Sequence, residues 1–149
     1  MKEIEVKIIN KSNNPDPAYE TPQSAGMDLR AFVQEDIVLN PGEVKLISTG
    51  IYIELPVGYE AQVRSRSGWA IKNKIRVFHG VGTIDADYRG EIGVILENAN
   101  KSWEPVIIHN GDRIAQLVIA KYEQALFLHV DKLGETERGN GGFGHSGVK

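Results

Sequence analysis

The sequence predicts an all-β domain, and three features of its 149 residues lead to this prediction. Apolar and β-branched residues occur in many short runs, spaced at intervals of roughly 8–12 residues. Turn-forming residues separate the runs, since the chain contains 16 glycines and 6 prolines. No segment carries a helical apolar stripe of useful length. Together these features are typical of one sandwich or barrel domain.

The expected strands can be placed from their residue patterns. Ile4, Val6 and Ile8 alternate with charged residues, which predicts a half-buried strand over 4–8. A similar alternation predicts a strand over 25–31. Further strands are expected at 36–39, 44–47, 50–55, 59–63, 75–78, 93–96, 106–108, 114–119 and 126–130, with turns at 40–42, 56–58 and 110–112. The only expected helix is one or two turns over 67–73.

Composition excludes several classes of protein. The chain has no cysteine, which rules out disulfides, a thiol nucleophile and cysteine-ligated metal sites. Its net charge of −3 is unlike that of a general nucleic-acid binder, which is usually basic. No apolar run approaches the ~20 residues of a membrane span, and the N-terminus lacks the apolar core of a signal peptide. We therefore expect a cytoplasmic protein with no nucleic-acid or membrane partner.

The segment 132–149 differs from the expected domain of residues 1–131. Five of the nine residues from 139 to 147 are glycine, so too little apolar surface is available to order the segment. Nucleotide-binding glycine loops need a strand before and a helix after, and only five residues follow Gly144. We expect a flexible glycine-rich arm. It is either an inert terminus or a flap in which Arg138 reaches a phosphate and Phe143 stacks on a planar ring.

Four segments inside the domain carry the candidate chemistry. Segment 80–90 holds two carboxylates, a phenol and a guanidinium, and Asp85 can accept a proton from an attacking water. Segment 64–68 presents arginine and serine donors that suit phosphate oxygens. Segments 25–31 and 111–116 add further aspartates and arginines. Each segment also has a plain structural interpretation, as a turn, a solvated loop or a strand end.

Arginine is concentrated in the candidate segments, although the chain as a whole is acidic. Six of the seven arginines lie in these segments or at the start of the glycine-rich stretch, and only Arg76 lies elsewhere. Arginine is preferred where a phosphate is bound through two parallel hydrogen bonds. The sequence therefore predicts a local phosphate site, which the net charge alone conceals.

Five motifs, in this order, closely resemble those of the trimeric deoxyuridine triphosphatases (dUTPases). They are AGMDLRA (25–31), RSRSGWA (64–70), GVGTIDADYRGEIGV (80–94), GDRIAQLVI (111–119) and RGNGGFGHSG (138–147). The resemblance covers nearly the whole chain. It implies a jelly-roll-like β barrel that assembles as a homotrimer, with each active site shared between subunits. It also implies hydrolysis of dUTP to dUMP and pyrophosphate, which limits uracil incorporation into DNA and supplies dUMP.

The resemblance also implies roles for individual residues. Asp85 is expected to deprotonate the water that attacks the α-phosphorus, and Tyr88 to pack against deoxyribose and exclude ribonucleotides. The expected substrate contacts are Gly82, Thr83 and Ile84 around uracil, Arg66, Ser67, Gly68 and Gln116 along the phosphates, and Arg138, Phe143, Gly144 and Ser146 in the closing arm. Asp28 is expected to support the phosphate site, and His79 stands where some members place an amide that helps to read uracil. Mg²⁺ is expected to be held by the triphosphate and water, without a direct protein ligand.

Two alternative functions remain open at this point. A dCTP deaminase shares the fold, but it needs an additional acid or base near the pyrimidine, and segment 84–88 matches the triphosphatase version. The second alternative is a dUTPase with an added regulatory role in protein binding. The chain retains the whole catalytic set, which a purely binding role would not require.

Overall fold

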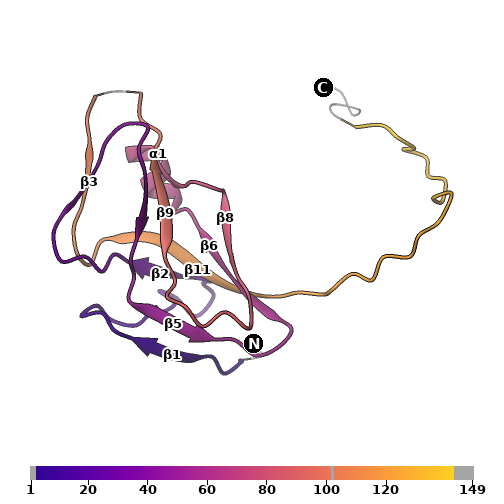
Figure 1. Ribbon diagram of the computed structural model, residues 1–149, viewed down its shortest axis with the longest axis horizontal. Coiled ribbons are helices and arrows are strands. Elements are labelled where there is room, and N and C mark those ends of the chain that lie inside the picture. Colours follow the sequence, from indigo (N-terminus) through magenta and orange to yellow (C-terminus); the bar gives the residue numbers. More distant parts are fainter. Residues whose placement is uncertain (1–2, 102, 143–149) are drawn as a thin grey trace.

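The computed structural model describes residues 3–101 and 103–142 (Figure 1). Its strands are β1 (Lys7–Asn10), β2 (Gly26–Arg30), β3 (Ile37–Leu39), β4 (Val44–Ile47), β5 (Ile51–Glu54), β6 (Tyr59–Arg64), β7 (Ile75–Val77), β8 (Val81–Ile84), β9 (Val94–Asn98), β10 (Val106–Ile108) and β11 (Arg113–Lys121). The one helix in this described part, α1 (Ser67–Asn73), spans the residues at which a helix was expected. The all-β prediction is confirmed. No helix within the described ranges is long and apolar enough to cross a membrane.

The antiparallel strands form four hydrogen-bonded sheets. The largest has the order β2-β11-β6-β8, and a three-stranded sheet has the order β4-β9-β7. Two further sheets are the strand pairs β1-β5 and β10-β3. Among the described strands these ladders do not join into one closed barrel. The expected barrel is therefore an arrangement of separate sheets around a common core.

The core between the sheets is apolar. Its largest fully buried side chains include Leu29, Leu39, Ile47, Ile75, Ile92, Leu96, Ile108 and Ile114. Strand β9 shows how the pattern arises, because Val94, Leu96 and Asn98 are buried while the residues between them are half-exposed. The buried Asn98 amide donates to the Leu39 carbonyl at 2.9 Å, so this polar group is satisfied. The core thus supports the strands that carry the candidate site.

Two expected strands differ from the structure. The first begins at Lys7 instead of Ile4 and runs to Asn10, because these are the residues that pair with β5. The strand expected at 126–130 is not formed, since β11 ends at Lys121 and residues 122–142 contain no strand. The apolar run is present, but none of the described strands pairs with it. Its side chains stay exposed, with Leu126 98% accessible.

Residues 123–142 form an arm that extends away from the β-sheet body (Figure 1). A turn near its end is closed by two hydrogen bonds: the Gly139 N–H donates to the Thr136 carbonyl at 3.1 Å, and Arg138 Nε donates to the Gly141 carbonyl at 2.8 Å. Three expected site residues, Phe143, Gly144 and Ser146, lie outside the described residues.

Candidate active site

A small pocket lies where β2 and β11 meet the start of α1. Its volume is about 250 Å³, and we call it the Arg66 pocket; it is lined by Glu20, Ser24, Gly26, Asp28, Arg66, Ser67, Gly68 and Gln116. Strand register explains the grouping, because Gln116 of β11 lies opposite Asp28 on one side and Arg64 on the other. Five residues expected to bind or support the phosphates therefore share one pocket.

Asp28 holds two arginines beside this pocket. Arg66 Nε donates to Asp28 Oδ1 at 2.8 Å, and Arg113 Nη1 lies 3.3 Å from Asp28 Oδ2. The side chains of Asp28 and Arg66 are 19% and 29% exposed, so water screens the pair only in part. Arg66 Nη1 also donates to the Arg113 carbonyl at 3.2 Å. A guanidinium has five N–H donors, so three remain on Arg66 for a ligand.

The side chain of Gln116 is fixed on both sides. Gln116 Nε2 donates to the Ser65 carbonyl at 3.0 Å. Its Oε1 lies beside Gly26, where an added Cβ would be 2.5 Å away, so a larger residue there would displace the Gln116 side chain. The second hydrogen on Gln116 Nε2 is left to donate to a ligand. The pocket thus presents N–H donors of Arg66 and Gln116 whose side chains are already held in place by hydrogen bonds within the chain.

A second pocket, of about 300 Å³, lies beside β8 and the loop 85–91. We call it the Tyr88 pocket; it is lined by Leu46, Val63, His79, Gly82, Thr83, Ile84, Asp85, Tyr88, Glu91, Gly93 and Ile95. Six of these are expected site residues. A mainly apolar wall with a few polar groups is typical of a site for a small organic ligand. A Cβ at Gly82 would lie 3.2 Å from His79 Nε2, so the β8 backbone closely approaches this imidazole.

The loop 85–91 places Asp85 and Tyr88 at the Tyr88 pocket. The Tyr88 N–H donates to the Asp85 carbonyl at 3.1 Å, which closes a turn. The Tyr88 hydroxyl donates to the Glu91 carbonyl at 3.0 Å and ties the ring to the end of the loop. Arg89 Nη1 donates to the Ala86 carbonyl at 2.8 Å, inside the same loop. The Asp85 side chain remains exposed at the pocket.

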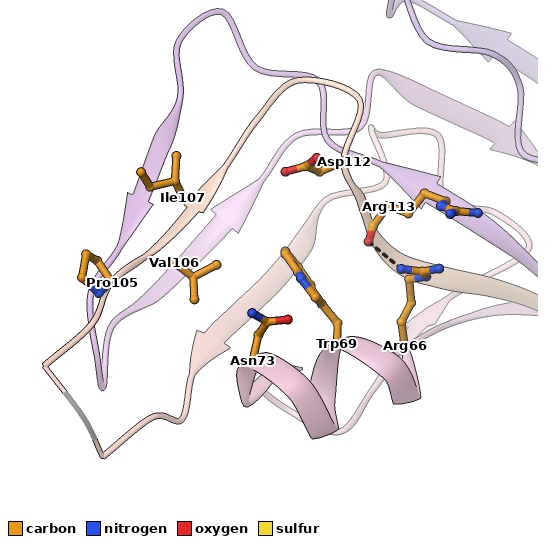
Figure 2. A pocket seen from close by; sticks show the side chains of 8 residues that line it. All are labelled: Arg66, Trp69, Asn73, Pro105, Val106, Ile107, Asp112 and Arg113. Carbon is orange, nitrogen blue, oxygen red and sulfur yellow. Dashed lines mark hydrogen bonds between the residues drawn. The ribbon is translucent and has the colours of Figure 1, made fainter.

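A groove of about 510 Å³ lies on the other side of Arg66, and Figure 2 shows it from close by. Trp69 and Asn73 project from α1 toward the segment that carries Val106, and a dashed line marks the hydrogen bond from Arg66 to the Arg113 carbonyl. Sequence reasoning did not predict this groove. Trp69 was a signal for it, because an indole at the start of a short helix needs neighbours to cover it.

The expected site residues lie in three separate places on one chain. The Arg66 pocket and the Tyr88 pocket have no lining residue in common. Arg138 lies in the exposed arm, where its Nε donates to the Gly141 carbonyl, and it lines neither pocket. One chain thus separates the arginine-containing pocket, the Asp85 carboxylate and the arm.

Comparison with known proteins shows which family the chain belongs to. A family model described as dUTPase matches residues 4–147. The chain belongs to the dUTPase family. Two relatives named deoxyuridine 5'-triphosphate nucleotidohydrolase, from Finegoldia magna and Cytophaga hutchinsonii, are each 54% identical to it. The alignments cover 97% and 95% of this chain and 99% and 91% of the relatives.

A solved structure supports the same dUTPase fold. It is a mutant dUTPase of Staphylococcus bacteriophage 80alpha with dUpNHpp, and it is 27% identical to this chain. The match covers 97% of this chain and 99% of the phage protein, with a TM-score of 0.84. The four-sheet arrangement described above is therefore the dUTPase fold.

Two pocket residues of this dUTPase were missed by sequence reasoning. Glu20 Oε1 lies 3.3 Å from Arg113 Nη1, across 93 residues of sequence. The Glu91 carboxylate accepts hydrogen bonds from residues 48–50. No local spacing predicts such partners, because they are brought together only by the folded sheets. The available signal was position, because Glu20 lies just before the motif at 25–31 and Glu91 lies inside the motif at 80–94.

Proposed function

We propose that this chain hydrolyses dUTP to dUMP and pyrophosphate, at active sites that form between three copies of the chain. The family supports the reaction, and the observation that carries the assembly is the division of the machinery into two pockets and an exposed arm. In the proposal, the Tyr88 pocket of one copy receives the deoxyuridine. The Arg66 pocket of a second copy and the arm of a third hold the triphosphate.

The arm supports an assembly of more than one copy. Leu126, Phe127 and Leu128 are each at least 85% exposed, although such apolar side chains are usually buried. An extended apolar segment that none of the described strands pairs with is suited to packing on another protein surface. The proposal places this surface on a neighbouring copy. Arg138 then reaches an active site that its own body does not form.

The Arg66 pocket supplies fixed donors for the phosphates. Three N–H donors of Arg66 and one of Gln116 remain after their internal hydrogen bonds are formed. Because Asp28 already holds the Arg66 guanidinium, little reorganisation is needed when the phosphates bind. Ser67 and Gly68, at the exposed start of α1, line the same pocket and can contact the phosphate chain.

Asp85 is the proposed general base. Its carboxylate lies at the Tyr88 pocket and accepts a proton from a water molecule as the water oxygen attacks the α-phosphorus. A new P–O bond forms to that oxygen, and the bond from the α-phosphorus to the bridging oxygen breaks. Pyrophosphate leaves with the bonding electron pair. Tyr88 packs against the deoxyribose and leaves no room for a 2′-hydroxyl.

Mg²⁺ is proposed to bind mainly through the triphosphate and water. Both Asp28 oxygens face arginine nitrogens, so the carboxylate in the Arg66 pocket is engaged by cations of the chain itself. Within residues 3–101 and 103–142 no group of three or more histidine, aspartate or glutamate side chains could hold a metal. These residues fit an ion that arrives with the nucleotide, a common binding mode of Mg²⁺. When bound, the ion neutralises charge on the phosphates.

Pyrophosphate release tests the proposed reaction. The purified protein is incubated with Mg²⁺ and each of the four common deoxynucleoside triphosphates, dUTP or UTP, and ammonia is measured with dCTP to detect deamination. We expect selective release from dUTP and no ammonia. Asp85→Asn should nearly abolish turnover and keep nucleotide binding. Asp87→Asn is the matched control, because that side chain lines a neighbouring groove and not the Tyr88 pocket. Equal release from all nucleotides would refute the proposal.

A further inference from the structure

Glu91 lines the Tyr88 pocket, and its carboxylate is anchored by three donors of the segment Ser48–Gly50, which joins β4 to β5. Its Oε1 accepts hydrogen bonds from the Ser48 hydroxyl, from the Thr49 N–H at 3.0 Å and from the Gly50 N–H at 2.7 Å. Hydrogen bonds to a charged acceptor are stronger than those between neutral groups. Burial alone would raise the pKa of Glu91, but the hydrogen bonds from Ser48, Gly50 and Thr49 hold this pKa below its usual value. The anchor is therefore ionised at neutral pH.

The segment Ser48–Gly50 that holds Glu91 is itself tied to neighbouring residues by hydrogen bonds and contains a buried side chain. Thr49 is 1% exposed, and its hydroxyl donates to the Ile92 carbonyl at 2.5 Å. The Ile92 N–H donates to the Ile51 carbonyl at 2.8 Å. Glu91 is thus held through its own side chain. Ile92 is held by a hydrogen bond from the Thr49 hydroxyl and by a second one to the Ile51 carbonyl. The end of the loop 85–91 has little freedom to move.

The backbone carbonyl of Glu91 contacts the Tyr88 side chain and so helps to set the position of its ring. The Tyr88 hydroxyl donates to the Glu91 carbonyl at 3.0 Å. The ring also lies directly over Gly90, where any added Cβ would overlap the phenol. The ring is therefore held by one hydrogen bond and one close backbone contact, both at the loop end that Glu91 anchors. Tyr88 itself is 44% exposed.

We propose that Glu91 is a positioning residue for sugar discrimination: its carboxylate, bound by the segment Ser48–Gly50, fixes the carbonyl that sets the Tyr88 ring against the sugar. This inference rests on the proposed function, in which Tyr88 excludes a 2′-hydroxyl. Glu91 need not touch the substrate to act in this way. Loss of the anchor frees the loop end, the ring shifts, and a ribose is accommodated more readily.

The first test is Glu91→Gln, which keeps the shape of the side chain and removes its charge. We expect kcat/KM for dUTP relative to UTP to fall about tenfold, the effect of weakening one or two hydrogen bonds that set the ring. Glu43→Gln is the matched control, because Glu43 also accepts a backbone N–H within a turn, from Asn40 at 2.8 Å, and lines neither pocket. This control should keep the wild-type ratio.

A double-mutant comparison separates positioning from a general structural effect. In a Tyr88→Phe background the hydroxyl that donates to the Glu91 carbonyl is absent, so Glu91→Gln should change the dUTP/UTP ratio less than it does in the wild type. An equal change in both backgrounds would overturn the inference. A wild-type dUTP/UTP ratio in Glu91→Gln, together with a lower melting temperature, would also overturn the inference.

If Glu91→Gln does not fold, Ser48→Ala is tested instead, because it removes one of the three donors to the Glu91 carboxylate. Its kcat/KM for dUTP relative to UTP should also fall, and a wild-type ratio would overturn the inference. A wild-type protein that does not hydrolyse dUTP would overturn the proposed function and this inference together. A wild-type protein that discriminates dUTP from UTP, beside a Glu91→Gln variant that discriminates equally, would overturn this inference alone.

Discussion

Replacing Asp28 with asparagine tests whether the Arg66 guanidinium is preset for phosphate binding. The substitution keeps the size of the side chain, but it removes the charge that faces Arg66 Nε at 2.8 Å and Arg113 Nη1 at 3.3 Å. Because an amide has one oxygen, at most one of the two arginines keeps an acceptor. The other then faces an NH₂ group. Arg66 should lose its fixed orientation while the pocket keeps its shape.

The expected magnitude follows from the type of hydrogen bond. A hydrogen bond to a charged group contributes about 1.5–3 kcal/mol. Asp28 and Arg66 are 19% and 29% exposed, and the amide of Asp28→Asn still offers one acceptor, so we take the lower end of this range. A loss of about 1.4 kcal/mol corresponds to about a tenfold weaker affinity. We therefore expect kcat/KM for dUTP to fall about tenfold, with most of the change in KM.

A matched ion pair elsewhere provides the control. Arg76 Nε donates to Glu97 Oε2 at 2.6 Å, and the Glu97 side chain is 17% exposed, close to the value for Asp28. Glu97→Gln should keep wild-type kinetics, because neither residue lines the Arg66 pocket. Calorimetric titration with a non-hydrolysable dUTP analogue measures the affinity directly. Wild-type affinity in Asp28→Asn, or an equal loss in Glu97→Gln, would refute the reasoning.

Three further predictions concern pH, backbone strain and the arm. The hydrogen bond that His109 donates to the Asp36 carboxylate raises the pKa of His109, so their pair stabilises the fold below about pH 6.5 and this contribution is lost as pH rises through the raised pKa. The melting-temperature gap between wild type and Asp36→Asn should therefore be larger near about pH 5.5 than near about pH 8.5. Gly50→Ala should lower the free energy of unfolding by about 2–4 kcal/mol in urea titrations, because Gly50 has a φ of 69° and its Cβ would lie 2.9 Å from a backbone nitrogen. Gly42→Ala, with a φ of 76° and open space around it, should cost only about 1–2 kcal/mol. Deleting 138–149 should leave the melting temperature of the body unchanged and greatly reduce dUTP hydrolysis; normal hydrolysis would show that the arm is not needed.

Local features of the fold were predictable from the sequence. Helix α1 has the expected bounds, and strands β4 and β10 cover the expected residues. A strand with one buried face carries its period-two pattern in its own residues, so no knowledge of its partner is needed. The five motif segments could also be identified from their own residues, because glycine and arginine occur together in each of these short stretches.

Features that depend on a distant partner were not predictable. The run 126–130 has the composition of a strand, but a strand also needs a neighbour, and none of the described strands pairs with it. Glu91 lies inside the motif at 80–94, but its contacts could not be predicted, since its donors lie 41 to 43 residues earlier in the chain. The division of the expected site into two pockets was also not predictable from the sequence. It depends on how β6, β8 and β11 are ordered in one sheet.

The charges around the Arg66 pocket predict that triphosphate binding requires further cations. Arg66 and Arg113 are the arginines at this place, and Asp28 and Glu20 face them at 2.8 to 3.3 Å. Two positive charges are thus balanced by two negative ones before any ligand arrives. A triphosphate adds several negative charges that this group cannot neutralise by itself. In the proposed function Arg138 and Mg²⁺ provide the missing charge, so productive binding requires both the arm of another copy and the metal-bearing nucleotide, and the balanced pocket alone holds phosphate weakly.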